Sequence, residues 1–323
     1  MRCLELFAGA GGAAIGLEDA GIEHAALCEW NKDACATLRA AGLGPVVQGD
    51  VRDLDAIAAV AGENIDLLWS SFPCQAWSTA GKRKGKEDDR NGWPWTVDAI
   101  DRFTPSWFLG ENVRGLLLHR TTCQRHKRNA GRKTRGASTD PTTCPGCYFE
   151  LVILPGLQAR FAHVGWWLLD AADYGVPQHR RRIILWAGPA PLVEPTPTHG
   201  PGRARLWVSM RKALGLQSER PGVYAGKPSP TVICKERDGA RAAWSVSSKR
   251  QGGFEHASDA LYLITGRRRL TIDECARLQD FPADHPWRGS ATSRYTQIGN
   301  AVPPQLAYVV ATALLLAEGS HVG

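Results

Sequence analysis

The chain alternates short apolar runs with segments of helical spacing from its first residues, and this alternation constrains the fold more than any other feature. The apolar runs predict strands at residues 3–7, 25–28, 46–48, 65–69, 107–110, 166–170 and 182–187. The first helix is expected to end at Gly21, and the second to begin at Asn31 and end at Gly42, because these residue types satisfy the backbone groups at helix ends. Strands and helices in alternation predict an α/β fold with a mostly parallel sheet covered on both faces.

The alternation stops after Gly188, where five prolines occur between residues 189 and 201. We expect this linker to separate a first unit, residues 1–189, from a second unit, residues 190–284, with short strands near 231–234 and 243–246. A C-terminal segment, residues 285–323, contains a helix that starts at Pro303 with helical apolar spacing. We expect that helix to return to the first unit.

The composition is that of a soluble globular protein with a slight excess of positive charge. The 323 residues include 39 Lys and Arg against 32 Asp and Glu, a net charge of +7 that suits a nucleic-acid partner. The first strand begins almost at Met1 and no apolar run reaches membrane-spanning length, so a cytoplasmic location is expected. The nine cysteines therefore indicate reduced thiols, metal ligands or a catalytic thiol in preference to a disulfide framework.

Cys74 is the candidate nucleophile. It stands in the run Phe72-Pro73-Cys74-Gln75, after a predicted strand and at a proline that ends regular pairing. The segment at residues 78–91 mixes glycines with basic residues, which is typical of a loop that closes over an anionic substrate. The alternative is a buried structural thiol, the common fate of a free cysteine.

A glycine-rich turn follows the first strand and precedes a helix, in the run Phe7-Ala8-Gly9-Ala10-Gly11-Gly12. Glycines at such a turn let a ligand approach the backbone at a helix N-terminus, although tight packing is the alternative explanation. Glu29 follows the second predicted strand and Asp50 the third, at the sheet edge where ligands bind in open α/β folds. Together these features favour a cofactor that contains a nucleoside.

Six segments resemble, in the same order, the motifs of the DNA (cytosine-5) methyltransferases. They are Leu4-Glu5-Leu6-Phe7-Ala8-Gly9-Ala10-Gly11-Gly12, Phe72-Pro73-Cys74-Gln75, Glu111-Asn112-Val113, Gln178-His179-Arg180-Arg181-Arg182, Arg277-Leu278-Gln279-Asp280-Phe281-Pro282 and Gly299-Asn300-Ala301-Val302-Pro303. One motif alone is weak, but six in order are specific. The resemblance implies a Rossmann-like fold and methyl transfer from S-adenosylmethionine to carbon 5 of a cytosine in double-stranded DNA.

The resemblance also implies where the cofactor S-adenosylmethionine binds. Phe7 would lie against the adenine, Glu29 would hold the ribose hydroxyls and Asp50 the adenine amino group, although each acid has the alternative of a surface or capping carboxylate. The implied cofactor-binding residues are Phe7, Ala8, Gly9, Ala10, Gly11, Gly12, Glu29, Trp30, Asp50, Val51, Pro73, Asn300 and Val302.

The implied chemistry begins with the Cys74 thiolate, which adds to carbon 6 of cytosine because carbon 5 is by itself a poor nucleophile. Glu111 would donate to or share a proton with ring nitrogen N3 and bind the exocyclic amine. Arg180 and Arg182, on one face of a strand, would both point into the cleft and hold the base carbonyl and a flanking phosphate. Arg181 should face away.

The second unit corresponds to the family's target-recognition domain, whose variable part would reach about residue 267. Its basic residues suit phosphate contacts: Lys227, Lys235, Arg237, Arg241, Lys249 and Arg250. The target cytosine must be flipped out of the duplex, and the loop at residues 78–92 is the candidate for closing behind it. The resemblance implies a monomer and allows a companion restriction endonuclease.

An insertion at residues 119–148 departs from the family's common pattern. It contains Cys123 and His126 as Cys-x2-His, followed by Cys144 and Cys147 as Cys-Pro-Gly-Cys. Paired ligands with a turn inside each pair suit tetrahedral zinc, so we expect a structural zinc ion at these four residues. A basic loop with incidental cysteines is the alternative.

Two other functions fit parts of the sequence. Relatives that methylate transfer RNA carry a Cys-Phe-Thr signature, where this chain has Val232-Ile233-Cys234-Lys235, and this difference disfavours an RNA substrate. A non-catalytic DNA-binding homologue would be expected to lose the nucleophile or the cofactor glycines, whereas Cys74 and Gly9 to Gly12 are present. Transfer of a modified group in place of methyl cannot be recognised from sequence.

Overall fold

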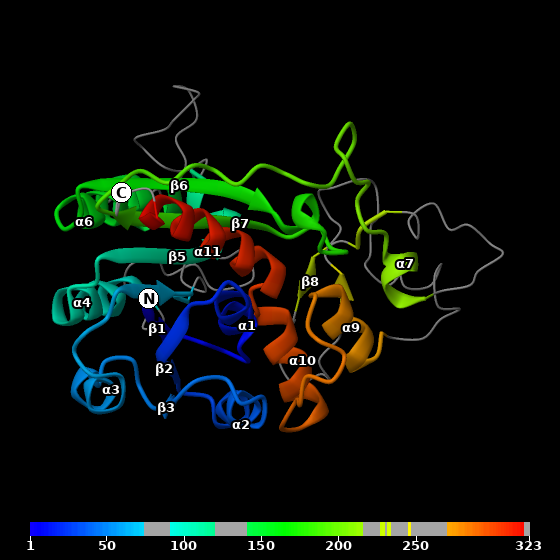
Figure 1. The fold of residues 1–323 in the computed structure, drawn as a ribbon, viewed down its shortest axis with the longest axis horizontal. Coiled ribbons are helices and arrows are strands. Elements are labelled where there is room, and N and C mark those ends of the chain that lie inside the picture. The colour runs from blue at the N-terminus through cyan, green and yellow to red at the C-terminus, as the bar shows by residue number, and fades with distance from the viewer. Residues whose placement is uncertain are drawn as a thin grey trace, which may run out of the picture.

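One twisted sheet with helices on both faces forms the body of the protein (Figure 1). The computed structural model describes residues 1–73, 91–119, 141–215, 227–229, 231–233, 245–246 and 270–319. Within these residues seven strands pair in the order β3-β2-β1-β4-β5-β7-β6. The strands are β1 (Arg2–Leu6), β2 (Glu23–Glu29), β3 (Val46–Gln48), β4 (Leu67–Ser70), β5 (Trp107–Val113), β6 (His163–Asp170) and β7 (Arg181–Gly188).

Strands β1 to β5 are parallel, and β7 runs antiparallel to both of its neighbours. The predicted α/β fold with a mostly parallel sheet is therefore confirmed. The strand β5 continues three residues beyond the predicted end at Gly110, because Glu111, Asn112 and Val113 pair with Ile184, Ile183 and Arg182 of β7. The antiparallel neighbour thus extends the strand into polar sequence that periodicity alone assigns to a loop.

Helices follow the strands in chain order. The longer helices are α1 (Gly12–Asp19), α2 (Lys32–Ala40), α3 (Leu54–Ala61), α4 (Trp93–Phe103), α9 (Ile272–Leu278), α10 (Ala291–Asn300) and α11 (Pro304–Gly319); the shorter elements are α5 (Pro145–Tyr148), α6 (Leu154–Gln158), α7 (Met210–Leu214), the 3-10 turns η2 (Arg114–Leu117), η4 (Pro141–Thr143) and η6 (Ala171–Tyr174), and the π turn η5 (Phe149–Ile153). Asn31 caps α2 as expected, accepting hydrogen bonds from Asp33 N and Ala34 N. The sequence interpretation missed α3 and α4, although Pro94 in the first turn of α4 is a typical start signal.

The two faces of the sheet are covered by different helices because successive strand residues point to opposite faces. In β5, Phe108 packs in the cluster that includes α3, α4, α6 and η5, whereas Trp107 and Leu109 pack in the cluster that includes α1 and α11. The helix α11 lies so close to α1 that a Cβ on Gly16 would be 2.2 Å from Pro304 O. The C-terminal helix therefore packs against the first helix, within the unit to which the sequence predicts that it returns.

The stretch Ala291–Gly319 is long and apolar enough, by composition, to cross a membrane, and half of its most apolar window is buried inside the protein. It consists of two helices, α10 and α11, which are separated at residues 301–303. Burial against the sheet accounts for its apolar character, as in the core helices of many globular proteins.

A third apolar cluster lies beside the sheet. It contains Met210 and Leu214 of α7, Val232 of β8 (Val232–Ile233), residues of α9, and Ile298 and Ala301. Strand β8 pairs with β9 (Ser245–Val246) in a separate two-stranded sheet. The cluster joins residues on both sides of the boundary expected at residue 284, and the boundaries themselves stay a prediction.

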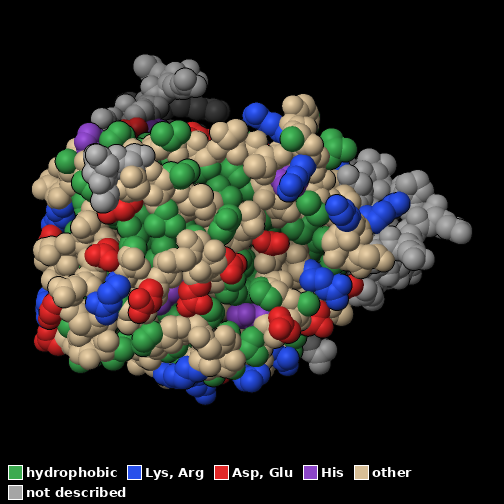
Figure 2. All heavy atoms as spheres, in the orientation of Figure 1, with side chains coloured by type: hydrophobic (Ala, Val, Ile, Leu, Met, Phe, Trp, Pro, Cys, Tyr) green, Lys and Arg blue, Asp and Glu red, His purple; other side chains and the backbone are tan. Residues whose placement is uncertain are grey.

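The proline-rich segment after β7 runs back along the body of the protein towards α7 (Figure 1). It is tied to η6, because Tyr174 Oη donates to Pro195 O and Thr198 N donates to Asp173 O. Between this segment and α11 lies a groove of about 630 Å³ lined mainly by apolar side chains, among them Val193 and Leu316. Figure 2 shows hydrophobic side chains gathered on this face. None of the candidate site residues lines the groove.

Candidate functional site

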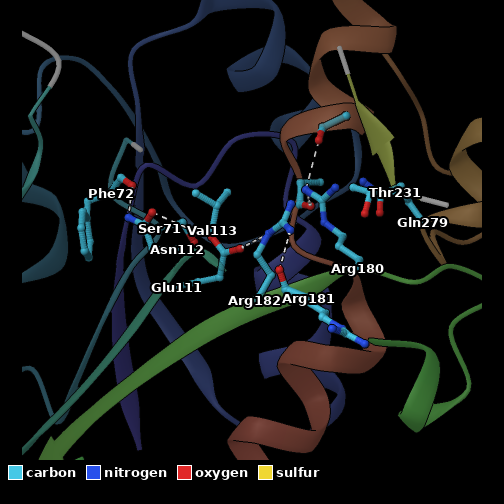
Figure 3. Close-up of polar contacts among 12 residues, drawn as sticks. Ser71, Phe72, Glu111, Asn112, Val113, Arg180, Arg181, Arg182, Thr231 and Gln279 are labelled. Carbon is cyan, nitrogen blue, oxygen red and sulfur yellow. Dashed lines mark hydrogen bonds and ion pairs between the residues drawn. The ribbon is translucent and has the colours of Figure 1, made fainter. Parts of the chain in front are cut away.

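Asn112 joins the ends of β4 and β5 at the edge where the parallel strands finish. Its side-chain nitrogen donates to Phe72 O at 3.1 Å, and its side-chain oxygen accepts from Val113 N at 2.9 Å (Figure 3). Asn112 is buried, so this pairing is shielded from water. Phe72 stands two residues before Cys74, and Asn112 therefore fixes the backbone that leads to the candidate nucleophile. Cys74 itself lies outside the described residues.

Glu111 and Arg182 form an ion pair beside Asn112. Arg182 Nε lies 2.7 Å from Glu111 Oε1, and both side chains are about nine-tenths buried. The pair forms because β7 runs opposite to β5, so the beginning of β7 meets the end of β5, with Arg182 opposite Val113. The structure brings these two predicted residues together. Arg182 Nη1 also donates to Arg181 O at 2.9 Å, so the guanidinium is held at two of its nitrogens.

Arg180 does not point into the same cleft as Arg182, and this expectation is wrong. Its guanidinium is buried and donates to Val232 O at 3.2 Å, Gly299 O at 3.1 Å and Ala301 O at 2.7 Å. Figure 3 shows a dashed line from Arg182 to Glu111 and no such line from Arg180 to Glu111. The alternation rule fails here because β7 begins at Arg181, so Arg180 precedes the regular strand.

Asp170, at the end of β6, holds the entry into β7. Its carboxylate accepts from Arg180 N at 2.9 Å, lies 3.1 Å from His179 Nδ1, and accepts from Arg181 Nε at 3.3 Å. Burial by itself raises the pKa of this carboxyl, but the hydrogen bonds from His179 and the backbone outweigh burial and lower the pKa. Arg181 is about half exposed and faces away from Glu111, as predicted. Sequence reasoning did not identify Asp170, which is the last residue of a predicted strand but belongs to no recognised motif.

Gln178 is a second buried polar residue at this entry. Its side-chain nitrogen donates to Leu278 O at 3.0 Å and to Gln279 Oε1 at 2.8 Å, while its oxygen accepts from Val232 N at 2.8 Å. Together with Arg180, it ties the start of β7 to the third apolar cluster. The motif that contains Gln178 was recognised in the sequence, but this role was not.

The glycine-rich turn between β1 and α1 adopts left-handed backbone conformations, with φ of 59° at Phe7, 58° at Gly9 and 89° at Gly11. At Gly12 the constraint is space, since a Cβ there would lie 2.1 Å from Val302 O. The turn therefore packs directly on the backbone of the last predicted motif. Val302 is buried and the neighbouring Asn300 is exposed.

Glu29, at the end of β2, holds the turn from the other side. Its Oε2 accepts from Gly9 N and its Oε1 from Asn31 N, both at 2.8 Å. Burial raises the pKa of this carboxyl, and the backbone hydrogen bonds act in the opposite direction. The adjacent Trp30 is exposed over 79% of its surface, which leaves a large ring free to contact a ligand.

Asp50, two residues after β3, pairs with Arg52 at 2.5 Å. This hydrogen bond lowers the pKa of the Asp50 carboxyl. The Arg52 guanidinium lies 5.2 Å from the centre of the Trp95 ring, and Trp95 stacks on Phe7 with a centroid distance of 6.5 Å. Sequence reasoning missed Arg52 and Trp95, since neither belongs to a recognised motif.

Three potential metal ligands converge where the insertion meets the body of the protein. His119 Nδ1 lies 3.9 Å from Cys144 Sγ and 3.8 Å from Cys147 Sγ, and His119 Nε2 lies 3.2 Å from Glu150 Oε1. The two cysteines are the ones expected from the sequence, whereas His119 was not named there. The position of His119, a few residues before the predicted pair Cys123 and His126, could have identified it as a candidate ligand. Cys123 and His126 lie outside the described residues.

Comparison of the sequence with known proteins finds DNA methyltransferases along nearly the whole chain. The family model described as C-5 cytosine-specific DNA methylase matches residues 1–130 and 216–315. Type II methyltransferase M.NgoMIV of Neisseria gonorrhoeae is 32% identical, with 97% of each chain covered. Type II methyltransferase M.NaeI of Lentzea aerocolonigenes is 30% identical, covering 96% of this chain and 73% of its own.

Solved structures show the same fold at low sequence identity. The S. pombe Dnmt2 methyltransferase has a TM-score of 0.62 at 15% identity, with 98% of this chain and 99% of its own covered. The Entamoeba histolytica methyltransferase EhMeth has a TM-score of 0.63 at 13% identity, with 98% of each chain covered. At these identities the likeness concerns the fold alone.

Proposed function

The chain belongs to the family of C-5 cytosine-specific DNA methylases, and we propose that it carries out the family's reaction with Cys74 as the nucleophile and Glu111 as the acid. The single observation that carries this assignment is the hydrogen bond from Asn112 to Phe72 O. It links the strand that bears Glu111 to the backbone two residues before Cys74.

In the proposed mechanism the Cys74 thiolate adds to carbon 6 of the flipped-out cytosine, and the electron pair of the ring moves towards carbon 5. Glu111 shares a proton with N3 and accepts from the exocyclic amine, which stabilises the charge that the addition creates. S-adenosylmethionine, when bound, supplies the methyl group as an electrophilic sulfonium. After transfer, loss of the proton at carbon 5 allows elimination of the thiolate and restores the ring.

Arg182 has two proposed tasks. Its Nε contact at 2.7 Å fixes one carboxylate oxygen of Glu111, and this orients the second oxygen towards the base. We propose that its guanidinium also donates to the carbonyl oxygen of a cytosine held by Glu111. Arg180, which holds three backbone carbonyls, is proposed as a positioning residue in place of the catalytic role expected from the sequence.

The residues proposed to bind the cofactor lie around the β1–α1 turn. The fit is supported by the open space beside Gly9 and by the exposed ring of Trp30. Glu29 is proposed to accept hydrogen bonds from the ribose hydroxyls, through the carboxylate lone pairs that do not accept from Gly9 N and Asn31 N. Asp50 would exchange part of its contact with Arg52 for the adenine amino group. Ala8, Ala10, Val51, Pro73, Asn300 and Val302 complete the proposed pocket.

The substrate is proposed to be a specific sequence in double-stranded DNA. The Type II methyltransferases similar along the whole chain and the net charge of +7 support this assignment. We further propose a monomer in the cytoplasm, recognition through residues 190–284, and a companion restriction endonuclease. Lys227 is the one proposed phosphate contact within the described residues, where it is exposed.

We also propose a structural zinc ion in the insertion. The approach of Cys144 and Cys147 to a common histidine supports it, and Cys123 and His126 stay predicted ligands.

Bisulfite sequencing of a plasmid from cells that express the chain tests the proposed function and identifies the target site. Purified protein should transfer labelled methyl groups to duplex DNA and not to transfer RNA. Cys74→Ser should abolish transfer while DNA binding persists. Normal methylation by this variant would refute the mechanism.

A further inference from the structure

His119, Cys144 and Cys147 place three donor atoms around one point. All three atoms lie within 4.8 Å of one another, and the two cysteines are buried. A tetrahedral zinc ion with Zn–S of about 2.3 Å and Zn–N of about 2.0 Å separates nitrogen and sulfur by roughly 3.5 Å. The observed separations of 3.9 and 3.8 Å are a few tenths of an ångström wider, so a small contraction forms the site.

Glu150 orients the histidine for this task. Its carboxylate lies 3.2 Å from His119 Nε2, which favours the tautomer with the proton on Nε2. The lone pair of Nδ1 then faces the two sulfurs. A carboxylate that binds the far nitrogen of a ligating histidine is the usual second contact in zinc sites, because it fixes the ring and raises its basicity.

The turn between the cysteines is shaped around the imidazole ring. Gly146 stands in the middle of Cys144-Pro145-Gly146-Cys147, and a Cβ there would lie 2.6 Å from His119 Cε1 and 2.7 Å from Nδ1. Gly146 N also donates to Leu118 O at 3.2 Å. Any larger residue would therefore displace the ring from the two sulfurs.

We propose that His119, Cys144 and Cys147 bind a zinc ion, with His119 as the ligating histidine and Glu150 as the residue that orients it. The inference rests on the zinc ion proposed for the insertion and replaces His126, the histidine predicted from the sequence, with His119 as the ligating histidine. Both sulfurs bind as thiolates, so binding releases their protons to solvent.

The position of the site gives the ion a structural role in the active site. His119 follows η2, which continues directly from β5 and Glu111. On the other side, α5 carries Tyr148, whose hydroxyl accepts from Asn91 Nδ2 at 3.0 Å. Asn91 is where the chain that follows Cys74 rejoins the described structure. The zinc ion thus joins the strand that bears Glu111 to the anchor of the segment that bears Cys74.

Metal analysis of the purified full chain tests the proposal. The wild type should contain about one zinc ion per chain, and His119→Ala and Cys147→Ser should lose it. Glu150→Gln should weaken zinc binding by about 10- to 100-fold. His163→Ala, at an exposed histidine on β6, is the matched control and should retain the metal.

Cobalt substitution of the wild type keeps the test valid if a variant fails to fold. Thiolate-to-cobalt absorption bands with the strong visible bands of a tetrahedral ion are expected. A wild type that binds neither zinc nor cobalt would overturn the zinc ion altogether. If the wild type contains zinc and His119→Ala binds zinc equally well, the protein has a zinc ion but His119 is not its ligand.

Hydrogen exchange reports the structural role separately from activity. Removal of zinc should accelerate exchange in residues 91–95 and 114–119. Unchanged exchange in both segments would show that the ion does not join them.

Discussion

The guanidinium of Arg182 lies 2.7 Å from the carboxylate of Glu111, across a pair of antiparallel strands in an otherwise mostly parallel sheet. In a parallel pair both residues would have to stand at the carboxyl ends of their strands. The reversed strand β7 instead brings its first residues to that edge. The result is an ion pair that is nearly buried and in which each group orients the other. This pair is the part of the site that mutation can test most directly.

Arg182→Lys should lower kcat by about 10²-fold, because an ammonium group cannot reproduce the planar fork that orients Glu111. Single-turnover methyl transfer to duplex DNA measures the effect. The adjacent Arg181→Lys, on the exposed side of β7, should change kcat little. Equal losses in the two variants would contradict the proposed orientation of Glu111.

Arg180→Met should destabilise the fold and weaken cofactor binding together. Three backbone carbonyls lose a buried donor, and each unpaired group costs about 1–3 kcal/mol. The free energy of unfolding should fall by about 3 kcal/mol or more, and the Kd for S-adenosylmethionine should rise because residues 299–301 precede Val302.

Denaturant unfolding and calorimetric titration test this prediction, with Arg181→Met as the control. A variant of Arg180 that keeps wild-type stability but loses kcat would instead support the direct contact with the base that the sequence suggests.

Asn112→Ala should loosen the approach to Cys74. Phe72 O loses its buried donor, so we expect a loss of about 1–3 kcal/mol in stability and a larger relative fall in kcat than in cofactor affinity. The exposed Asn64→Ala serves as control. Cofactor affinity that falls as far as kcat would point to general unfolding of the site.

Gly12→Ala should impair cofactor binding through the backbone. The added methyl group would meet Val302 O, and overpacking of this kind costs about 1–3 kcal/mol. Gly49→Ala, where a Cβ has open space, should fold normally. Calorimetric titration with S-adenosylmethionine compares the two, and an unchanged Kd for Gly12→Ala would be inconsistent with the packing described.

Stability should fall as the pH rises from about 6.5 to 9, through His24. Burial disfavours the charged ring, but contacts with Glu18 and Glu5 outweigh burial and raise the pKa of His24 to about 9. A folded-state pKa above the unfolded value of about 6.5 means that the stabilisation is complete below pH 6.5 and is lost as the pH passes 9.

Unfolding free energies measured between pH 6 and 9.5 test this against His24→Gln. The difference in unfolding free energy between the two proteins should shrink with rising pH, because the contribution of His24 is lost. Buried thiols such as Cys28 affect both proteins alike and cancel in this difference. A constant difference would show that His24 is not charged in the folded protein.

The sequence predicted the strands and the glycine-rich turn after β1 well, because apolar runs and glycines act locally. The strand β3 was predicted at its observed bounds, and Asn31 caps α2 as expected. It failed at Arg180, because the position where β7 begins depends on Asp170, a residue of another strand. It also missed His119, whose partners lie more than twenty residues away in the chain. Contacts between distant segments set both features, and periodicity carries no signal for them.

The reversal of β7 also determines how the proposed recognition region is attached. The strand β7 begins at the edge of the sheet where Arg182 lies and ends at Gly188, roughly 27 Å away at the opposite edge. The chain must therefore run back along the sheet before it reaches α7. The proline-rich residues 189–209 can span roughly 60 Å when extended, more than this return requires. The proposed recognition region is thus connected by a segment that is longer than this distance requires. Recognition regions of different sizes could be exchanged at this point while Arg182 keeps its position beside Glu111.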